Sequence, residues 1–251
     1  MKKLLPLFFM FFAVGCVHSP AGQGMGISQQ EVESRLNLAE MYLVEAEPRM
    51  ALEQLRVVEK ETGDNPMLFF LLGVTYELLG NLDKSVDAYQ RAVNLAPHFG
   101  DAWNNLGQIR QARGEIEAAK HAYEKALGLE EYMTPEFAAY NMAALLAEQG
   151  RFDQSLAYSS LGLERNRRYI PLYQQRADIL RSTGRLEEAA EVLEKGIANR
   201  PDSQALKLML AEELVRLDRE MEAIRLFTLI SEQNPDSDEA RTALHYLEVL
   251  R

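Results

Sequence analysis

The sequence predicts an all-α fold, a right-handed superhelix of six helix–turn–helix repeats that is closed by a C-terminal helix. Three observations predict it. Small residues recur at spacings of 34, 34, 36, 34 and 34, at Ala39, Gly73, Gly107, Ala143, Ala177 and Ala211. A second small residue follows each of them by 12 positions, at Ala51, Ser85, Ala119, Ser155, Ala189 and Ala223. A glycine lies between the two in four repeats, at Gly80, Gly114, Gly150 and Gly184.

Each repeat has the pattern of two helices that pack closely at the small residues. Larger side chains fill the space around the crossing, as Trp103, Leu106 and Tyr123 do in the third repeat. The glycine supplies the left-handed turn that ends the first helix, and proline soon after the second helix stops it. One such unit cannot bury its apolar face alone, so the units are expected to stack into a solenoid.

The pattern is clearest in DAWNNLGQIRQARGEIEAAKHAYEKAL, and it resembles the tetratricopeptide repeat (TPR), a helix–turn–helix of 34 residues. Ala46 and Asp218 replace the turn glycine in the first and last repeats, as capping units allow. The expected repeats within residues 31–235 span 32–65, 66–99, 100–133, 136–169, 170–203 and 204–235. Residues 236–251 are expected to form the capping helix, with one apolar face of Ala240, Ala243, Leu244, Leu247 and Leu250.

The first 15 residues predict a signal peptide, and the residue that follows them is Cys16, the one cysteine of the chain. Lys2 and Lys3 precede an apolar run too short to span a bilayer. Ala13-Val14-Gly15-Cys16 resembles a bacterial lipobox, with Ala13 at the usual leucine position. That resemblance implies cleavage before Cys16, a diacylglycerol on its sulfur and an acyl chain, such as palmitate, on its amine. The alternative is an ordinary signal peptide with an incidental cysteine. Residues 16–30 are small and polar and predict a flexible tether.

Composition argues against several classes of function. The net charge is −11, which disfavours a nucleic-acid partner because phosphate contacts need a basic face. His18, His98, His121 and His245 are widely separated, and no catalytic motif is present, so we expect no enzyme, no metal site and no cofactor beyond the lipid. We interpret Arg165, Arg167 and Arg168 as cations placed where the C-terminus of a helix favours positive charge. A phosphate site is the alternative for these three.

In this repeat class the first helix of each repeat lines the concave side, where partners bind. The first two repeats place apolar residues there, and the next three place amides and aromatic rings. The predicted partner-binding groove comprises Leu36, Asn37, Met67, Phe70, Leu71, Val74, Asn104, Asn105, Gln108, Phe137, Tyr140, Asn141, Gln174 and Gln175. A row of amides could pair with the backbone of an extended guest. The alternatives are that residues 24–31 cover the apolar zone, that these residues belong to the core between repeats, or that the amides are ordinary polar surface.

The whole layout is similar to that of the type IV pilus biogenesis TPR lipoproteins, the pilotin-type proteins. The resemblance rests on the lipobox, the tether, the six repeats, DAWNNLG and the longer connection around EEYMTPE. It implies an outer-membrane lipoprotein on the periplasmic face, held to the membrane by its lipid alone, that binds the secretin subunit and promotes its assembly. Val17 is not the aspartate that retains enteric lipoproteins at the inner membrane. The alternative is a periplasmic adaptor for peptidoglycan hydrolases or for outer-membrane protein assembly.

Overall fold

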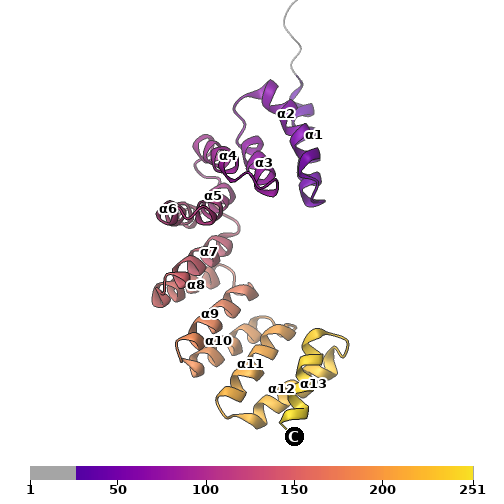
Figure 1. Cartoon of the computed structure of the whole chain (residues 1–251), viewed down its shortest axis with the longest axis vertical. Helices are drawn as coiled ribbons and strands as arrows, with labels where there is room; N and C mark the ends of the chain where they lie inside the picture. The colour runs from indigo at the N-terminus through magenta and orange to yellow at the C-terminus, as the bar shows by residue number, and fades with distance from the viewer. Residues whose placement is uncertain (1–26, 251) are drawn as a thin grey trace, which may run out of the picture.

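A computed structural model describes residues 27–250, and this part of the chain is entirely helical (Figure 1). The helices are α1 (Gln29–Val44), α2 (Pro48–Thr62), α3 (Pro66–Leu78), α4 (Leu82–Leu95), α5 (Gly100–Ala112), α6 (Ile116–Leu127), α7 (Pro135–Glu148), α8 (Phe152–Arg165), α9 (Ile170–Ser182), α10 (Leu186–Asn199), α11 (Gln204–Arg216), α12 (Glu220–Gln233) and α13 (Asp238–Val249). They pair in sequence from α1/α2 to α11/α12, and α13 packs on α12. The predicted all-α superhelix of helix–turn–helix repeats is confirmed.

The turns inside the repeats share one left-handed conformation, whatever residue occupies it. Gly80 has a φ of 73°, and the other three turn glycines lie between 71° and 76°. Ala46 and Asp218 adopt φ values of 58° and 56°. The same pair of backbone hydrogen bonds closes each turn, as when Ala46 N–H donates to the Leu43 carbonyl and Gly80 N–H to that of Glu77. The end repeats therefore keep the turn geometry at the cost of a conformation that disfavours a Cβ atom.

Small residues at the crossing of the two helices let the backbone of the first helix meet an aromatic ring of the second. A Cβ atom on Gly73 would lie 2.5 Å from the Tyr89 ring, and one on Gly107 would lie 2.5 Å from the Tyr123 ring. Both tyrosines are fully buried. Ser85 strengthens its own crossing, because its hydroxyl donates to the Gly73 carbonyl at 2.9 Å.

The longer connection between the third and fourth repeats is filled by one aromatic side chain. Tyr132 lies in it, between α6 and α7, and is buried against Gly100 at the start of α5. Gly100 has no Cβ, so the ring can rest directly on the helix backbone. This connection, which is longer by two residues, is therefore a packed corner and not a loose loop.

The C-terminal helix covers the last repeat through a stack of two aromatic rings. Tyr246 lies parallel to Phe227 of α12, with ring centroids 4.6 Å apart and planes 6° apart. Ala240, Ala243 and Leu247 are buried beneath it. Leu244, which was expected on the same face, is 48% exposed instead, because it lies past the edge of the contact with α12.

Helix α1 begins within the expected tether. Ser28 caps α1 by accepting a hydrogen bond from the Glu31 backbone N–H at 3.2 Å, so residues 29 and 30 of the expected tether belong to a helix. Cys16, the signal peptide and residues 17–26 of the expected tether lie outside the described residues. From residue 27 to 250, none of the helices has the length and hydropathy needed to cross a bilayer.

Candidate functional site

The first helices of the repeats line the inner side of the arc in Figure 1. Contacts join α1 to α3, α5 to α7, α7 to α9, α9 to α11 and α11 to α13, whereas the second helices of neighbouring repeats do not meet in this way. A curved array brings elements closest together on its inner side. The predicted groove residues therefore lie on helices that border the concave side.

The amide row of the predicted groove lies between repeats. Asn141 Nδ2 donates to Asn104 Oδ1 at 2.9 Å, and Asn105 Nδ2 donates to the Tyr89 hydroxyl at 3.3 Å. Gln175 Nε2 donates to the Tyr140 carbonyl at 3.2 Å. Each amide thus reaches back to the preceding repeat. These three side chains each use at least one donor within the array, so they have less hydrogen-bonding capacity left for the backbone of a guest.

The same register explains three other predicted groove residues. Leu71 shares the position of the amides, two residues before the small residue, and is buried against the first repeat. Leu36 and Asn104 lie one position earlier and are also buried. Asn37 has the amide position but no preceding repeat, so it lies exposed on α1 beside Met41. The helical pattern alone did not separate the core between repeats from the groove, because neighbouring positions on one helix serve both.

Two aromatic pairs join the first helix of a repeat to the residue that directly precedes the next repeat. The Phe70 ring lies 4.8 Å from Phe99, and Phe137 lies edge-on to Tyr169 at 5.3 Å. Tyr140 also meets Tyr169 edge-on, at 6.3 Å. The sequence reasoning missed Phe99 and Tyr169 because both precede their helices, α5 and α9. The sequence does contain a pattern that could have identified them, because each lies eight residues before the small residue of the repeat that follows it.

Exposed apolar side chains gather beside these pairs. Met67 at the start of α3 is 43% exposed, Phe137 at the start of α7 is 41% exposed, and Met133 just before α7 is 89% exposed. A surface cavity of about 380 Å³ lies between Met67, Phe99, Tyr132 and Met133. We call the following set the aromatic edge: Met67, Phe70, Phe99, Met133, Phe137, Tyr140 and Tyr169. It follows the N-terminal ends of the inner helices α3, α5, α7 and α9.

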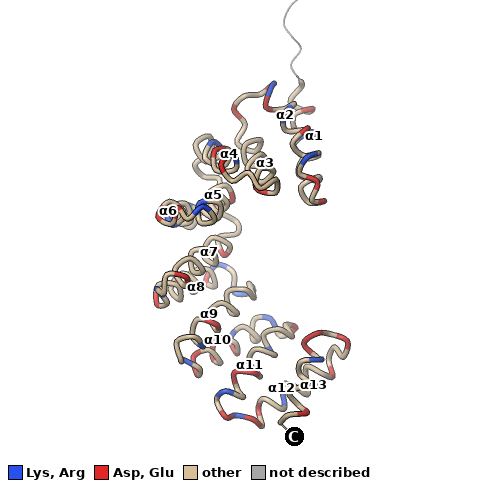
Figure 2. Tube along the Cα trace, viewed as in Figure 1, with Lys and Arg blue, Asp and Glu red and all other residues tan. Residues whose placement is uncertain are grey.

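The charged residues beside the aromatic edge are mainly acidic, since Asp101 and Glu131 line the cavity next to Met67 and Met133, together with His98. Helices α3 and α7 contain no lysine or arginine (Figure 2). Burial, followed by the nearby Tyr140 and Glu136, raises the pKa of Tyr169 above its ordinary value, so its hydroxyl is neutral at physiological pH. A contiguous apolar surface of this kind usually marks a protein-binding site.

The remaining predicted groove residues differ in how available they are. Val74, Gln108 and Gln174 are half-buried, and neither glutamine side chain makes a hydrogen bond with another residue of the range 27–250. Gln108 and Gln174 therefore keep their donors and acceptors for a guest. Gln111 does not, because the Tyr123 hydroxyl donates to its Oε1 at 2.9 Å.

The concave side of the last two repeats is charged. Glu213 of α11 is fully buried, and it accepts a hydrogen bond from Arg181 Nε of α9 at 2.8 Å. Arg216 approaches the same carboxylate at 3.4 Å, and Arg181 also pairs with Asp178 at 2.9 Å. Within the described residues, no group of three His, Cys, Asp or Glu side chains could hold a metal ion.

Comparisons with known proteins match these repeats. Family models described as tetratricopeptide repeats match residues 66–99, 100–132 and 180–245. A TPR repeat-containing protein of Pseudomonas aeruginosa is 33% identical over 78 residues, which cover 31% of this chain and 74% of that protein. A Haemophilus influenzae protein is 27% identical over 52% of this chain and 72% of its own length. The chloroplastic TPR protein PYG7 of Arabidopsis thaliana is 35% identical over 75 residues, but the chain spans a quarter of its length.

Solved structures share the fold over most of the chain. PilW, described as a widely conserved type IV pilus biogenesis factor, superposes with a TM-score of 0.67 at 21% identity, over 86% of this chain and all of PilW. Pseudomonas aeruginosa PilF superposes with a TM-score of 0.68 at 15% identity, over 85% of this chain and 96% of PilF. At these identities the likeness shows a common fold.

Proposed function

Because this chain belongs to the tetratricopeptide repeat family, we propose that it is a non-catalytic protein-binding scaffold that serves type IV pilus biogenesis as a lipoprotein. In this proposal it binds the secretin subunit and promotes its localisation and assembly in the outer membrane. Proteins of the family bind protein or peptide partners, and the fold is shared with PilW and PilF over their whole or nearly whole lengths. The observation that carries the proposal is the exposed aromatic edge.

The aromatic edge supplies the chemistry of recognition. Met67, Met133 and Phe137 lose exposed apolar surface when a partner covers them, and buried aromatic side chains often contribute about 2 kcal/mol or more to binding. Phe99 packs against the Phe70 ring and Tyr169 against the Phe137 ring, so these two rings lose little side-chain freedom on binding. The guest supplies an apolar helix face or strand, and Gln108 contacts its polar backbone.

Lipidation at Cys16 is the second part of the proposal. The support is the sequence: the cysteine directly follows the apolar run of the expected signal peptide. Each buried methylene contributes about 0.8 kcal/mol, so a diacylglycerol with an additional acyl chain gives stable anchoring. The tether then holds the first repeats, and with them the aromatic edge, close to the membrane in which the secretin assembles.

The binding test uses two exposed members of the aromatic edge and one matched control. Met67→Ala and Phe137→Ala remove apolar contact surface, whereas Leu244→Ala removes the same kind of surface from α13. Exposed positions are preferred over Phe70, because that ring also packs on Tyr89 at 5.9 Å. We expect the first two variants to lose co-purification with the secretin and to lower the yield of its heat-resistant multimers, while Leu244→Ala keeps both. Unchanged binding in both edge variants would overturn the proposed surface.

The localisation test replaces Cys16 with serine. We expect the variant to leave the outer-membrane fraction while still binding secretin in solution, because the anchor and the binding surface are separate. Retention in the outer membrane would overturn lipid anchoring.

If envelope extracts yield peptidoglycan hydrolases or outer-membrane assembly factors and no secretin, the pilus assignment fails and the adaptor function takes its place.

A further inference from the structure

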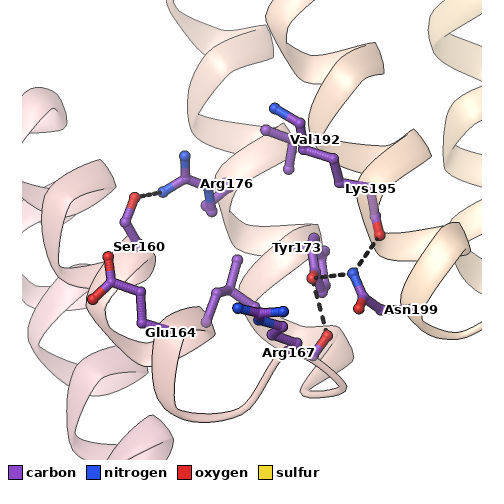
Figure 3. Close-up of a pocket in the computed structure, with 9 residues that line it drawn as sticks. Ser160, Glu164, Arg167, Tyr173, Arg176, Val192, Lys195 and Asn199 are labelled. Atoms are coloured by element: carbon purple, nitrogen blue, oxygen red, sulfur yellow. Dashed lines mark hydrogen bonds between the residues drawn. The ribbon is translucent and has the colours of Figure 1, made fainter.

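A second candidate site lies on the opposite, convex side of the array, between α8 and α10 (Figure 3). It is a cavity of about 390 Å³. Its polar wall holds Arg167 from the α8–α9 loop, Arg176 from α9 and Lys195 from α10, and Glu164 is the one carboxylate that lines it. Leu163, Val192 and the Tyr173 ring give it an apolar floor. Three elements thus bring cations around one opening in a chain of net charge −11.

Arg176 is the unusual residue of this site. It directly precedes the small residue Ala177, and the corresponding residues in four other repeats are apolar: Leu72, Leu106, Met142 and Leu210. All four are buried in the core between repeats. Repeat five therefore places a guanidinium where the others place a core side chain.

The surroundings of Arg176 hold it in that position. Its Nη1 donates to the Leu156 carbonyl and to the Ser160 hydroxyl, both at 2.6 Å. Ser160 is short where repeats two, three and five carry Gln90, Glu124 and Glu194, so it leaves the guanidinium room. Burial lowers the pKa of Arg176 from its ordinary value, Tyr173 offsets part of this, and the nearby Arg185 lowers the pKa further. An arginine that is partly desolvated beside another cation is costly for the fold.

Within residues 27–250, the three cations of the cavity are not ion-paired, although Glu164 lines the same cavity. Among the residues that the structure describes, Arg167, Arg176 and Lys195 form no ion pair, whereas Arg181, Arg185 and Arg200 each pair with a carboxylate. An unpaired, forked guanidinium that is already anchored on one side is well suited to bind a carboxylate in two-pronged fashion.

The shape of the site favours a segment of protein over a small ion. A second cavity of about 360 Å³ adjoins the first and shares Ser160, Arg176, Val192 and Lys195 with it. Leu156 and Leu180 add apolar surface there. Three carboxylates, of Asp153, Glu188 and Glu191, give its far end an acidic excess, although Arg185 also lines it and pairs with Asp153 and Glu188. The two cavities form one groove between α8 and α10, with a cationic end, apolar walls and an acidic end.

We propose that this groove binds a short segment of a partner protein in which one acidic side chain is followed by apolar ones, with the acidic carboxylate seated between Arg167, Arg176 and Lys195. The partner supplies the carboxylate because residues 1–26 of this chain contain no aspartate or glutamate. The groove is separate from the aromatic edge, so its test and that of the proposed function can fail independently.

The experiment compares the full chain with Arg176→Leu, which restores the residue type found in the other repeats. The probe is the peptide acetyl-Glu-Leu-Ala-Leu-Ala-Lys-amide, titrated into isotopically labelled protein while the amide signals of Gly162 and Gly196 are followed by NMR. We expect saturable shifts with this peptide, binding weaker by about tenfold or more for its Gln-for-Glu analogue, and loss of the shifts in Arg176→Leu. Arg165→Gln removes a charge of the same sign outside the cavity and should leave the shifts unchanged.

Thermal melting supplies the second measurement. If Arg176 is retained for binding at a cost to the fold, Arg176→Leu melts higher than the wild-type chain, by about 2–4 °C. A clear fall in melting temperature would make Arg176 a structural residue and overturn the proposal. Equal binding of the two peptides, or peptide binding that survives Arg176→Leu, would also overturn it. If inorganic phosphate shifts the same signals at the same concentration as the acidic peptide, the site takes small oxyanions and the peptide proposal is wrong.

Discussion

The concave sides of the first four repeats and of the last two are built on the same backbone but carry different chemistry. Repeats two and four place Met67 and Phe137 at one shared position, exposed on the surface, where repeats five and six have Pro171 and Ala205. Repeat five instead places Arg181 opposite the buried Glu213. Figure 2 shows the difference, with charged residues along α9 and α11 and nearly none along α3.

The comparison shows that stacking and recognition use different positions of one repeat. Small residues and turn glycines recur throughout because they set the helix crossing and the turn. The concave positions vary, because the repeats stack whether those positions hold methionine, amide or ion pair. In the last two repeats the concave side chains interact mainly with each other, and in the first four they leave apolar surface uncovered. This contrast is the reason for proposing the partner site in the first four repeats.

The largest expected effect on stability belongs to the charged half. Arg181→Ala removes the closest partner of Glu213 and leaves that carboxylate buried, which should cost about 3 kcal/mol, the lower end for a broken buried pair because Arg181 is partly exposed. Asn141→Ala removes a neutral hydrogen bond between repeats and should cost about 1 kcal/mol. Chemical denaturation of both variants measures the difference. Equal losses would show that the two halves are held together in the same way.

A second prediction concerns the helix crossing that both halves share. Gly107→Leu forces a side chain into the Tyr123 ring and should cost about 1–3 kcal/mol. Ala112→Leu is the control, because Ala112 is exposed near the end of the same helix. Thermal melting should separate the two variants clearly. If both melt alike, Gly107 is not at the crossing and the repeat register is wrong.

The smallest expected effect is a gain at the two end repeats. Ala46 and Asp218 adopt the left-handed conformation that glycine occupies elsewhere, so Ala46→Gly and Asp218→Gly should each stabilise the fold by about 1 kcal/mol. Gly80→Ala should lose a similar amount by the same reasoning. A loss of stability in both glycine variants would mean that the end turns favour their native side chains through contacts and not through backbone conformation.

The repeats could be predicted from sequence because their signals are local or strictly periodic. Gly107 needs a small residue at the crossing, and Gly80 needs a left-handed turn, wherever the repeat stands in the array. The partners of Asn105 and Asn141 could not be predicted, because they depend on the angle between successive repeats, which no single repeat encodes. The aromatic edge lies between these cases. Phe70 and Tyr140 were found on their helices, while Phe99 and Tyr169 required knowing that the loop before each helix folds onto the preceding repeat.

The most direct test of the aromatic edge as the partner surface is site-specific photocrosslinking in cells that assemble the secretin. A photoreactive phenylalanine replaces Met133, which is 89% exposed beside the aromatic edge, and in a second strain it replaces Asp178, which is exposed on the charged half. We predict an adduct that contains the secretin subunit from position 133 and none from position 178. An adduct from position 178 alone, or from neither position while the two proteins still co-purify, would contradict the assignment of partner binding to the aromatic edge.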